Sequence, residues 1–206
     1  MWSWISVALS GFISISAFEN HKIKQALLFK NMTSALLLIM LVERVPTWPT
    51  PTIWVALGLM VTMFADSLHL LDKWPKVCFF AFLSAQLCYS KAFWIQIPGT
   101  IVWWLPALLL ATSVVAFFLL LPQLDTLIFP VTIMGGVLVQ LAWASGEVWL
   151  KLPSWGSLVG FLGSLILILS ALLLAIHDYR RSLPYGQYWI SGSYWLAQAL
   201  IVASVL

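Results

Sequence analysis

The sequence predicts an all-α integral membrane protein: a compact bundle of eight transmembrane helices in one domain covering residues 1–206. Hydrophobic residues make up 62% of the chain and charged residues only 8%, whereas soluble domains have about 25% charged residues. Apolar stretches of about 20 residues, long enough to cross a bilayer, recur along the whole chain. The net charge of +3 is small and dispersed, so no nucleic-acid partner is expected.

Each predicted span is an apolar stretch that ends at a polar or helix-breaking connector. In chain order the spans are residues 2–18, 26–42, 52–71, 77–97, 101–121, 127–149, 156–177 and 187–205. The connectors are ENHKIK, ERVPTWPTP, DKWPK, IPGT, PQLDT, KLPSW and DYRRSLPYGQ. Because no lysine or arginine precedes Lys22, we expect the first stretch to be a retained span and not a cleaved signal peptide.

Lysine and arginine in the connectors predict the orientation, because cytoplasmic loops are enriched in both. The odd-numbered connectors carry Lys22, Lys24, Lys73, Lys76, Arg180 and Arg181. The even-numbered connectors carry only Arg44 and Lys151. We therefore expect the odd connectors in the cytoplasm and both termini in the periplasm, with a bacterial inner membrane as the location. Tryptophans near the span ends fit an aromatic belt.

Polar residues inside the spans are candidates for function, because hydrocarbon disfavours them. At a helix centre, an aspartate such as Asp66 costs about 2.5 kcal/mol or more on insertion scales. His69 lies three residues later and so on the same helix face. The predicted orientation places one group of candidates in the cytoplasmic half: Lys30, Asp66, His69, Ser170 and Tyr194. It places a second group nearer the midplane: Gln86, Tyr89 and Gln198. Glu147 is expected toward the opposite face, about 20 Å from Asp66 along the membrane normal.

These residues also have structural explanations. Lys30 could extend to the headgroups or form an ion pair with Asp66. Glu147 could pair at the interface with Lys151, four residues later. Interfacial positions or hydrogen bonds between helices could explain His69, His177, Gln86, Gln140 and Gln198.

The sequence predicts no metal site, no cofactor and no disulfide. The three histidines lie in different segments without ligand spacing: His21, His69 and His177. Hydrolase motifs such as H-E-x-x-H and G-x-S-x-G are absent, as are C-x-x-C and a phosphate-binding glycine loop. Cys78 and Cys88 fall in one predicted helix, about 15 Å apart, which is too far for a bridge between them.

Four segments in order carry a resemblance. FKNMTS is similar to F-K-P-L-T, and VTMFADSLHLL to S-x-x-G-D-x-x-L-x-L. FLSAQLCYSKAF is similar to F-x-x-x-H-x-x-Y-x-x-x-F, and SYWLAQALI to T-Y-Y-x-A-Q-x-L-I. The chain resembles the YhhN family of eight-span membrane proteins, which includes the lysoplasmalogenases. Polar positions of the family correspond here to Lys30, Thr33, Asp66, Tyr89, Tyr194 and Gln198.

Three positions depart from the family pattern. Ala65 stands where the family has glycine before the aspartate, and Gln86 where it has histidine. The family's serine–aspartate pair near the end of the seventh span is Ser170 and Ala171 here. Because Ala171 replaces the second aspartate, the family's usual two-carboxylate scheme is not expected for this chain.

The resemblance implies a hydrolase that cleaves the alkenyl ether of lysoplasmalogens to a fatty aldehyde and a glycerophospho-base. Such cleavage needs a general acid, and a carboxylic acid in a low-dielectric site can stay protonated near neutral pH. We therefore expect Asp66 to be the acid. The groups expected to orient water or stabilise the cation are Tyr89, Tyr194 and Gln198, with Ser170 at a compatible depth.

Substrate binding is expected to use Lys30, Thr33, His69, Gln86 and Ser170. A close pair with Asp66 would favour the ionised carboxylate and weaken the acid. We therefore favour Lys30 at the substrate phosphate, with the lipid tail among apolar side chains. The expected partners are a lysophospholipid and membrane lipids, with no obligate protein partner.

Two other interpretations stay open. The chain could be a family member that binds or remodels another lysolipid, as the missing second aspartate suggests. It could also be a small transporter that uses Asp66 and Lys30 as a relay, although the sequence shows no half-to-half repeat.

Overall fold

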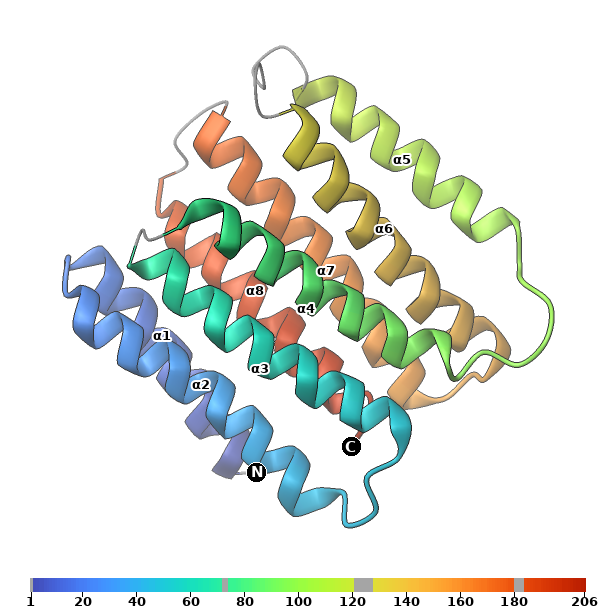
Figure 1. The fold of residues 1–206 in the computed structure, drawn as a ribbon, viewed down its shortest axis with the longest axis horizontal. Coiled ribbons are helices and arrows are strands. Elements are labelled where there is room, and N and C mark those ends of the chain that lie inside the picture. The colour runs from blue at the N-terminus through green and yellow to red at the C-terminus, as the bar shows by residue number, and fades with distance from the viewer. Residues whose placement is uncertain (1, 72–73, 121–127, 180–183) are drawn as a thin grey trace. The chain divides into compact units, whose positions relative to one another are not determined.

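The computed structural model describes residues 2–71, 74–120, 128–179 and 184–206. Eight α-helices run through these residues (Figure 1). They are α1 (Trp2–Glu19), α2 (Ile23–Arg44), α3 (Thr50–Leu70), α4 (Pro75–Trp94), α5 (Trp104–Leu120), α6 (Ile128–Lys151), α7 (Trp155–Tyr179) and α8 (Gly186–Ala203). The all-α prediction is confirmed, and every predicted span coincides with one helix.

The predicted ends agree with the helices to within three residues; the three largest differences are residue 26 against Ile23, residue 97 against Trp94 and residue 101 against Trp104. The fifth connector and the facing span ends at 121 and 127 lie outside the described residues. So do three cations of the orientation argument, Lys73, Arg180 and Arg181.

Five helices are long and apolar enough to cross a membrane: α2, α3, α4, α6 and α7. In α5, the segment Trp104–Phe118 is apolar but shorter, and α1 and α8, with 18 residues each, are not among the five. The chain is therefore an integral membrane protein in which five spans are supported by length and composition. Membrane crossing by α1, α5 and α8 stays a prediction.

Contacts within the chain divide it into two compact units, residues 1–92 with 205–206, and residues 93–204. Each unit is described by itself, and a single transmembrane domain covering residues 1–206 stays a prediction.

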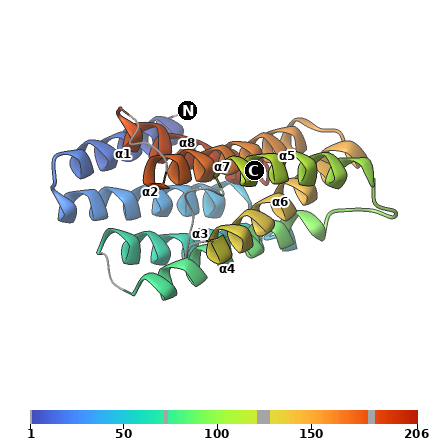
Figure 2. The ribbon, with the colours of Figure 1, turned by 90° about the horizontal axis from the view of Figure 1, so that it is seen from above.

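In the first unit, α1 packs on α2 and α2 packs on α3. Figure 2 shows α1, α2 and α3 as successive layers. Small polar residues on α1 allow the close approach: Ser10 Oγ donates to the Phe29 carbonyl at 3.0 Å, and Ser14 Oγ to the Ala26 carbonyl at 3.0 Å. Such serines are typical of helix interfaces in membranes, where small side chains let backbones approach.

In the second unit, α7 packs against both α6 and α8, and α5 packs against α6 (Figure 1). A cluster around Leu105 and Val139 forms the α5–α6 core. The hydroxyls of Ser145 and Ser164 lie 2.7 Å apart between α6 and α7. At Gly163 an added Cβ would lie 3.0 Å from Leu200, so a small residue lets α7 and α8 approach.

Candidate functional site

Asp66 on α3 and Lys30 on α2 form a buried ion pair. Lys30 Nζ lies 3.0 Å from Asp66 Oδ1, with side chains 14% and 2% exposed. The structure shows the ion pair that the sequence left open as an alternative, and contact of Lys30 with a substrate phosphate stays a prediction. The physical reason is that α2 and α3 are packed neighbours, and a carboxylate removed from water is strongly favoured beside a countercharge.

Two further contacts fix the backbone on either side of Asp66. Ser67 Oγ donates to Asn31 Oδ1 at 3.1 Å, which links the residues that directly follow the two ionic partners. Cys78 Sγ donates to the Ala65 carbonyl at 3.5 Å, which links the start of α4 to α3. Neither contact was predicted from the sequence. Asn31 directly follows Lys30 and Ser67 directly follows Asp66, and these matching positions could have predicted the first contact.

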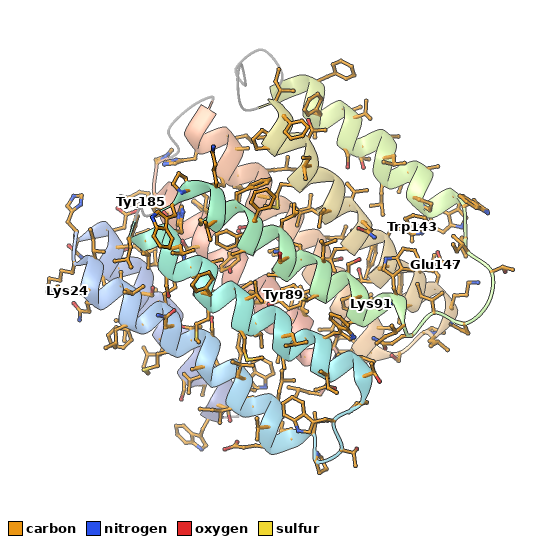
Figure 3. All side chains as sticks on the ribbon, in the orientation of Figure 1. Lys24, Tyr89, Lys91, Trp143, Glu147 and Tyr185 are labelled. Atoms are coloured by element: carbon orange, nitrogen blue, oxygen red, sulfur yellow. The ribbon has the colours of Figure 1, made fainter. Side chains whose placement is uncertain are left out.

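Tyr89 on α4 is completely buried and packs on Gly58 of α3 (Figure 3). A Cβ at Gly58 would overlap the Tyr89 ring, with Cδ1 at 2.7 Å, so only glycine fits without a shift. The phenol oxygen lies 3.4 Å from Thr62 Oγ1. Thr62 is four residues before Asp66, so the phenol lies one turn along α3 from the ion pair. Gly58, Thr62 and Asp66 are spaced four residues apart and so lie on one face of α3, a pattern in the sequence that could have predicted this arrangement.

The other predicted residues of the first unit lie in three settings. Gln86 is 4% exposed, and its Oε1 has no hydrogen-bond partner within the described residues. The Thr33 hydroxyl lies 2.8 Å from the Phe29 carbonyl and 3.0 Å from Ser10 Oγ, on the side of α2 that meets α1. His69 is exposed, and its ring meets Phe82 edge-on at 6.4 Å.

Three predicted residues belong to the second unit. Ser170 Oγ donates to the Ile190 carbonyl at 2.9 Å and so links α7 to α8. The ring of Tyr194 packs edge-on against Trp195 at 5.3 Å, and Gln198 is buried. Their participation in a site with Asp66 stays a prediction.

A sequence model of the YhhN family matches residues 25–205, which include Lys30, Asp66 and Tyr89. The chain belongs to the YhhN family. The resemblance drawn from the four segments is therefore confirmed. Proteins named "Uncharacterized membrane protein YhhN" in Escherichia coli O6:H1, Escherichia coli O157:H7 and Shigella flexneri are each 27% identical to the chain over 206 residues. These alignments cover 100% of the chain and 99% of each relative. No solved structure matches the chain.

Proposed function

We propose that this YhhN family member is a membrane hydrolase that cleaves the alkenyl ether bond of lysoplasmalogens. The observation that carries the proposal is Asp66, a carboxylate 1% exposed on an apolar helix with the ammonium of Lys30 at 3.0 Å. A charged pair inside a membrane helix bundle is a functional candidate by default, because apolar residues would be cheaper there.

The reaction can run with one carboxylate. Protonated Asp66 gives its proton to the alkene carbon that does not bear the oxygen, which forms an oxocarbenium ion. Water adds to the other carbon and gives a proton back to the Asp66 carboxylate. The hemiacetal then breaks its carbon–oxygen bond to give the aldehyde and the free glycerol hydroxyl. The net reaction is hydrolysis of the alkenyl ether by one water molecule to the aldehyde and the glycerol hydroxyl, so no other co-reactant is required.

Lys30 links substrate binding to this chemistry. In the described structure the Lys30 ammonium lies 3.0 Å from Asp66 Oδ1. A neighbouring cation favours a carboxylate, which has no proton to give. The phosphate of an entering lysophospholipid competes for the same ammonium. Once Lys30 turns to the phosphate, the buried carboxyl group is left without its countercharge, and burial then favours the protonated form. Binding of the substrate phosphate to Lys30 thus favours the protonated form of Asp66 that the reaction needs.

The first unit also offers groups for orienting the ether. Tyr89 carries a buried hydroxyl one helical turn from Asp66. Gln86 lies three residues before Tyr89, one turn along α4, and its Oε1 is buried without a hydrogen-bond partner within the described residues. A phenol and an amide at this spacing suit the ether oxygen and the attacking water. Tyr194, Gln198 and Ser170 remain proposed contributors from the second unit.

Aldehyde release by the detergent-purified protein from an alkenyl lysophospholipid tests the proposal, with Asp66→Asn alongside. We expect at least a 100-fold loss in the variant, as for removal of a general acid. Glu43→Gln is the matched control, because it removes an exposed carboxylate at the end of α2, and it should keep the activity. Equal rates in wild type and Asp66→Asn would contradict the proposal.

A second candidate is a lysolipid-binding family member without this activity. Ala171, where the family pattern has aspartate, and the closed Lys30–Asp66 pair favour it. It predicts no aldehyde from the folded wild type and release only after Ala171→Asp.

A further inference from the structure

Glu147 on α6 is completely buried in the second unit. Its Oε1 accepts the Val102 N–H at 2.7 Å and lies 3.9 Å from Lys151 Nζ. The Lys151 ammonium also contacts the Thr100 carbonyl. These contacts hold the segment before α5 against the end of α6, and they use only one carboxylate oxygen. The expected pairing of Glu147 with Lys151 therefore accounts for half of the carboxylate.

Three buried polar atoms of α4 and α6 have no hydrogen-bond partner within the described residues: Glu147 Oε2, Trp143 Nε1 and Trp94 Nε1. We call these three residues the Glu147 cluster. Trp143 precedes Glu147 by one helical turn on the same face of α6 (Figure 3). The ring of Trp94 meets that of Trp143 edge-on, with centroids 5.0 Å apart.

The chemistry of the three atoms selects the ligand. An unpartnered buried polar group costs about 1–3 kcal/mol, and native proteins usually satisfy such groups with water, an ion or a ligand. A metal ion cannot use the indole N–H groups. A phosphate would be repelled by the carboxylate, and an ammonium would leave both indole donors unused. A hydroxyl donates to Oε2 and accepts from an indole N–H, so it matches donors and acceptor together.

The surroundings indicate an amphiphile. Glu147 is 0% exposed, whereas both tryptophans are partly exposed although their Nε1 atoms are buried, so part of each indole ring faces outward. Gly136 lies on the same face of α6 as Trp143 and Glu147, and a Cβ there would meet nothing within 4 Å. An apolar tail can lie along this open part of α6 while its polar end reaches the cluster.

We propose that the Glu147 cluster binds the alcohol hydroxyl of a membrane amphiphile, with Glu147 Oε2 accepting its hydrogen and the indole N–H groups donating to its oxygen. The proposal rests on the proposed function for the ligand class, since the glycerol hydroxyl of a lysophospholipid is such a group. A bound water molecule can donate and accept the same hydrogen bonds, and it is the alternative occupant of the cluster.

The test is equilibrium binding to the full-length protein in detergent. The probes are a saturated 1-O-alkyl lysophospholipid, which has no alkenyl bond to cleave, and its 2-O-methyl ether, which lacks the hydroxyl hydrogen. Wild type should bind the hydroxyl form about tenfold more tightly, as expected for a hydrogen bond to a charged group. Trp143→Phe, Trp94→Phe and Glu147→Gln should reduce this preference.

Trp149→Phe is the matched control, because Trp149 lies on the same helix but stacks on Phe161, with ring centroids 5.6 Å apart. It should keep the wild-type preference. Equal binding of the two probes by wild type, or an unchanged preference in both tryptophan variants, would overturn the proposal and assign the cluster to bound water. Because neither probe can be cleaved, a failure here is distinguishable from a failure of the Asp66 reaction.

Discussion

Gly58 determines how closely α3 and α4 approach at Tyr89. A glycine inside a helix normally costs about 1 kcal/mol relative to alanine. Here the missing side chain leaves the space that the buried phenol ring occupies. Close contact between the helices therefore outweighs helix propensity at this position, and the same contact places the phenol beside Thr62 and near Asp66.

Gly58→Ala should therefore destabilise the protein by about 1–3 kcal/mol, the usual cost of overpacking. Thermal unfolding in detergent measures the change. Gly136→Ala is the matched control, because a Cβ there meets nothing within 4 Å. It should stabilise the helix by up to about 1 kcal/mol. Stabilisation by Gly58→Ala would show that Tyr89 moves aside freely and does not hold a fixed position.

At the scale of elements, the Lys30–Asp66 ion pair links α2 to α3. Lys30→Met should cost about 3 kcal/mol, because it leaves a buried carboxylate without its countercharge. The double variant Lys30→Met with Asp66→Leu should regain most of this loss, because apolar residues of similar size replace a buried pair at little cost. Chemical unfolding of the two variants checks the coupling. A double variant as unstable as the single one would show that the pair is not the link.

The helices themselves were largely predictable. Long apolar stretches and proline-rich connectors fix where spans begin and end, and the structure departs by at most three residues. The largest departures run in both directions. α2 begins at Ile23, three residues before the predicted span, whereas α4 ends at Trp94 and α5 begins at Trp104, three residues inside theirs. Hydropathy predicts the hydrocarbon boundary, but a helix can continue past it, as in α2, or can end earlier beside helix breakers, as α4 and α5 do around the IPGT connector.

At the scale of the whole molecule, the bias of lysine and arginine predicts which ends face the cytoplasm. Single cysteines at Lys24 and Trp48, both exposed, can be introduced after Cys78 and Cys88 are replaced by serine. In spheroplasts, an impermeant maleimide should label Trp48→Cys directly and Lys24→Cys only after permeabilisation. The reverse pattern would contradict the predicted orientation.

The sequence by itself determined the membrane class, the eight helices and the family, because these depend on composition, local hydropathy and ordered motifs. It also identified Asp66, Lys30 and Tyr89 as polar residues within the spans and as candidates for function. Only the tertiary structure decided those partners. Lys30 pairs with Asp66, Tyr89 packs on Gly58, and Glu147 binds the Val102 N–H with one oxygen. Each of these depends on how neighbouring helices are rotated against one another, and side-chain packing across the interface sets that rotation.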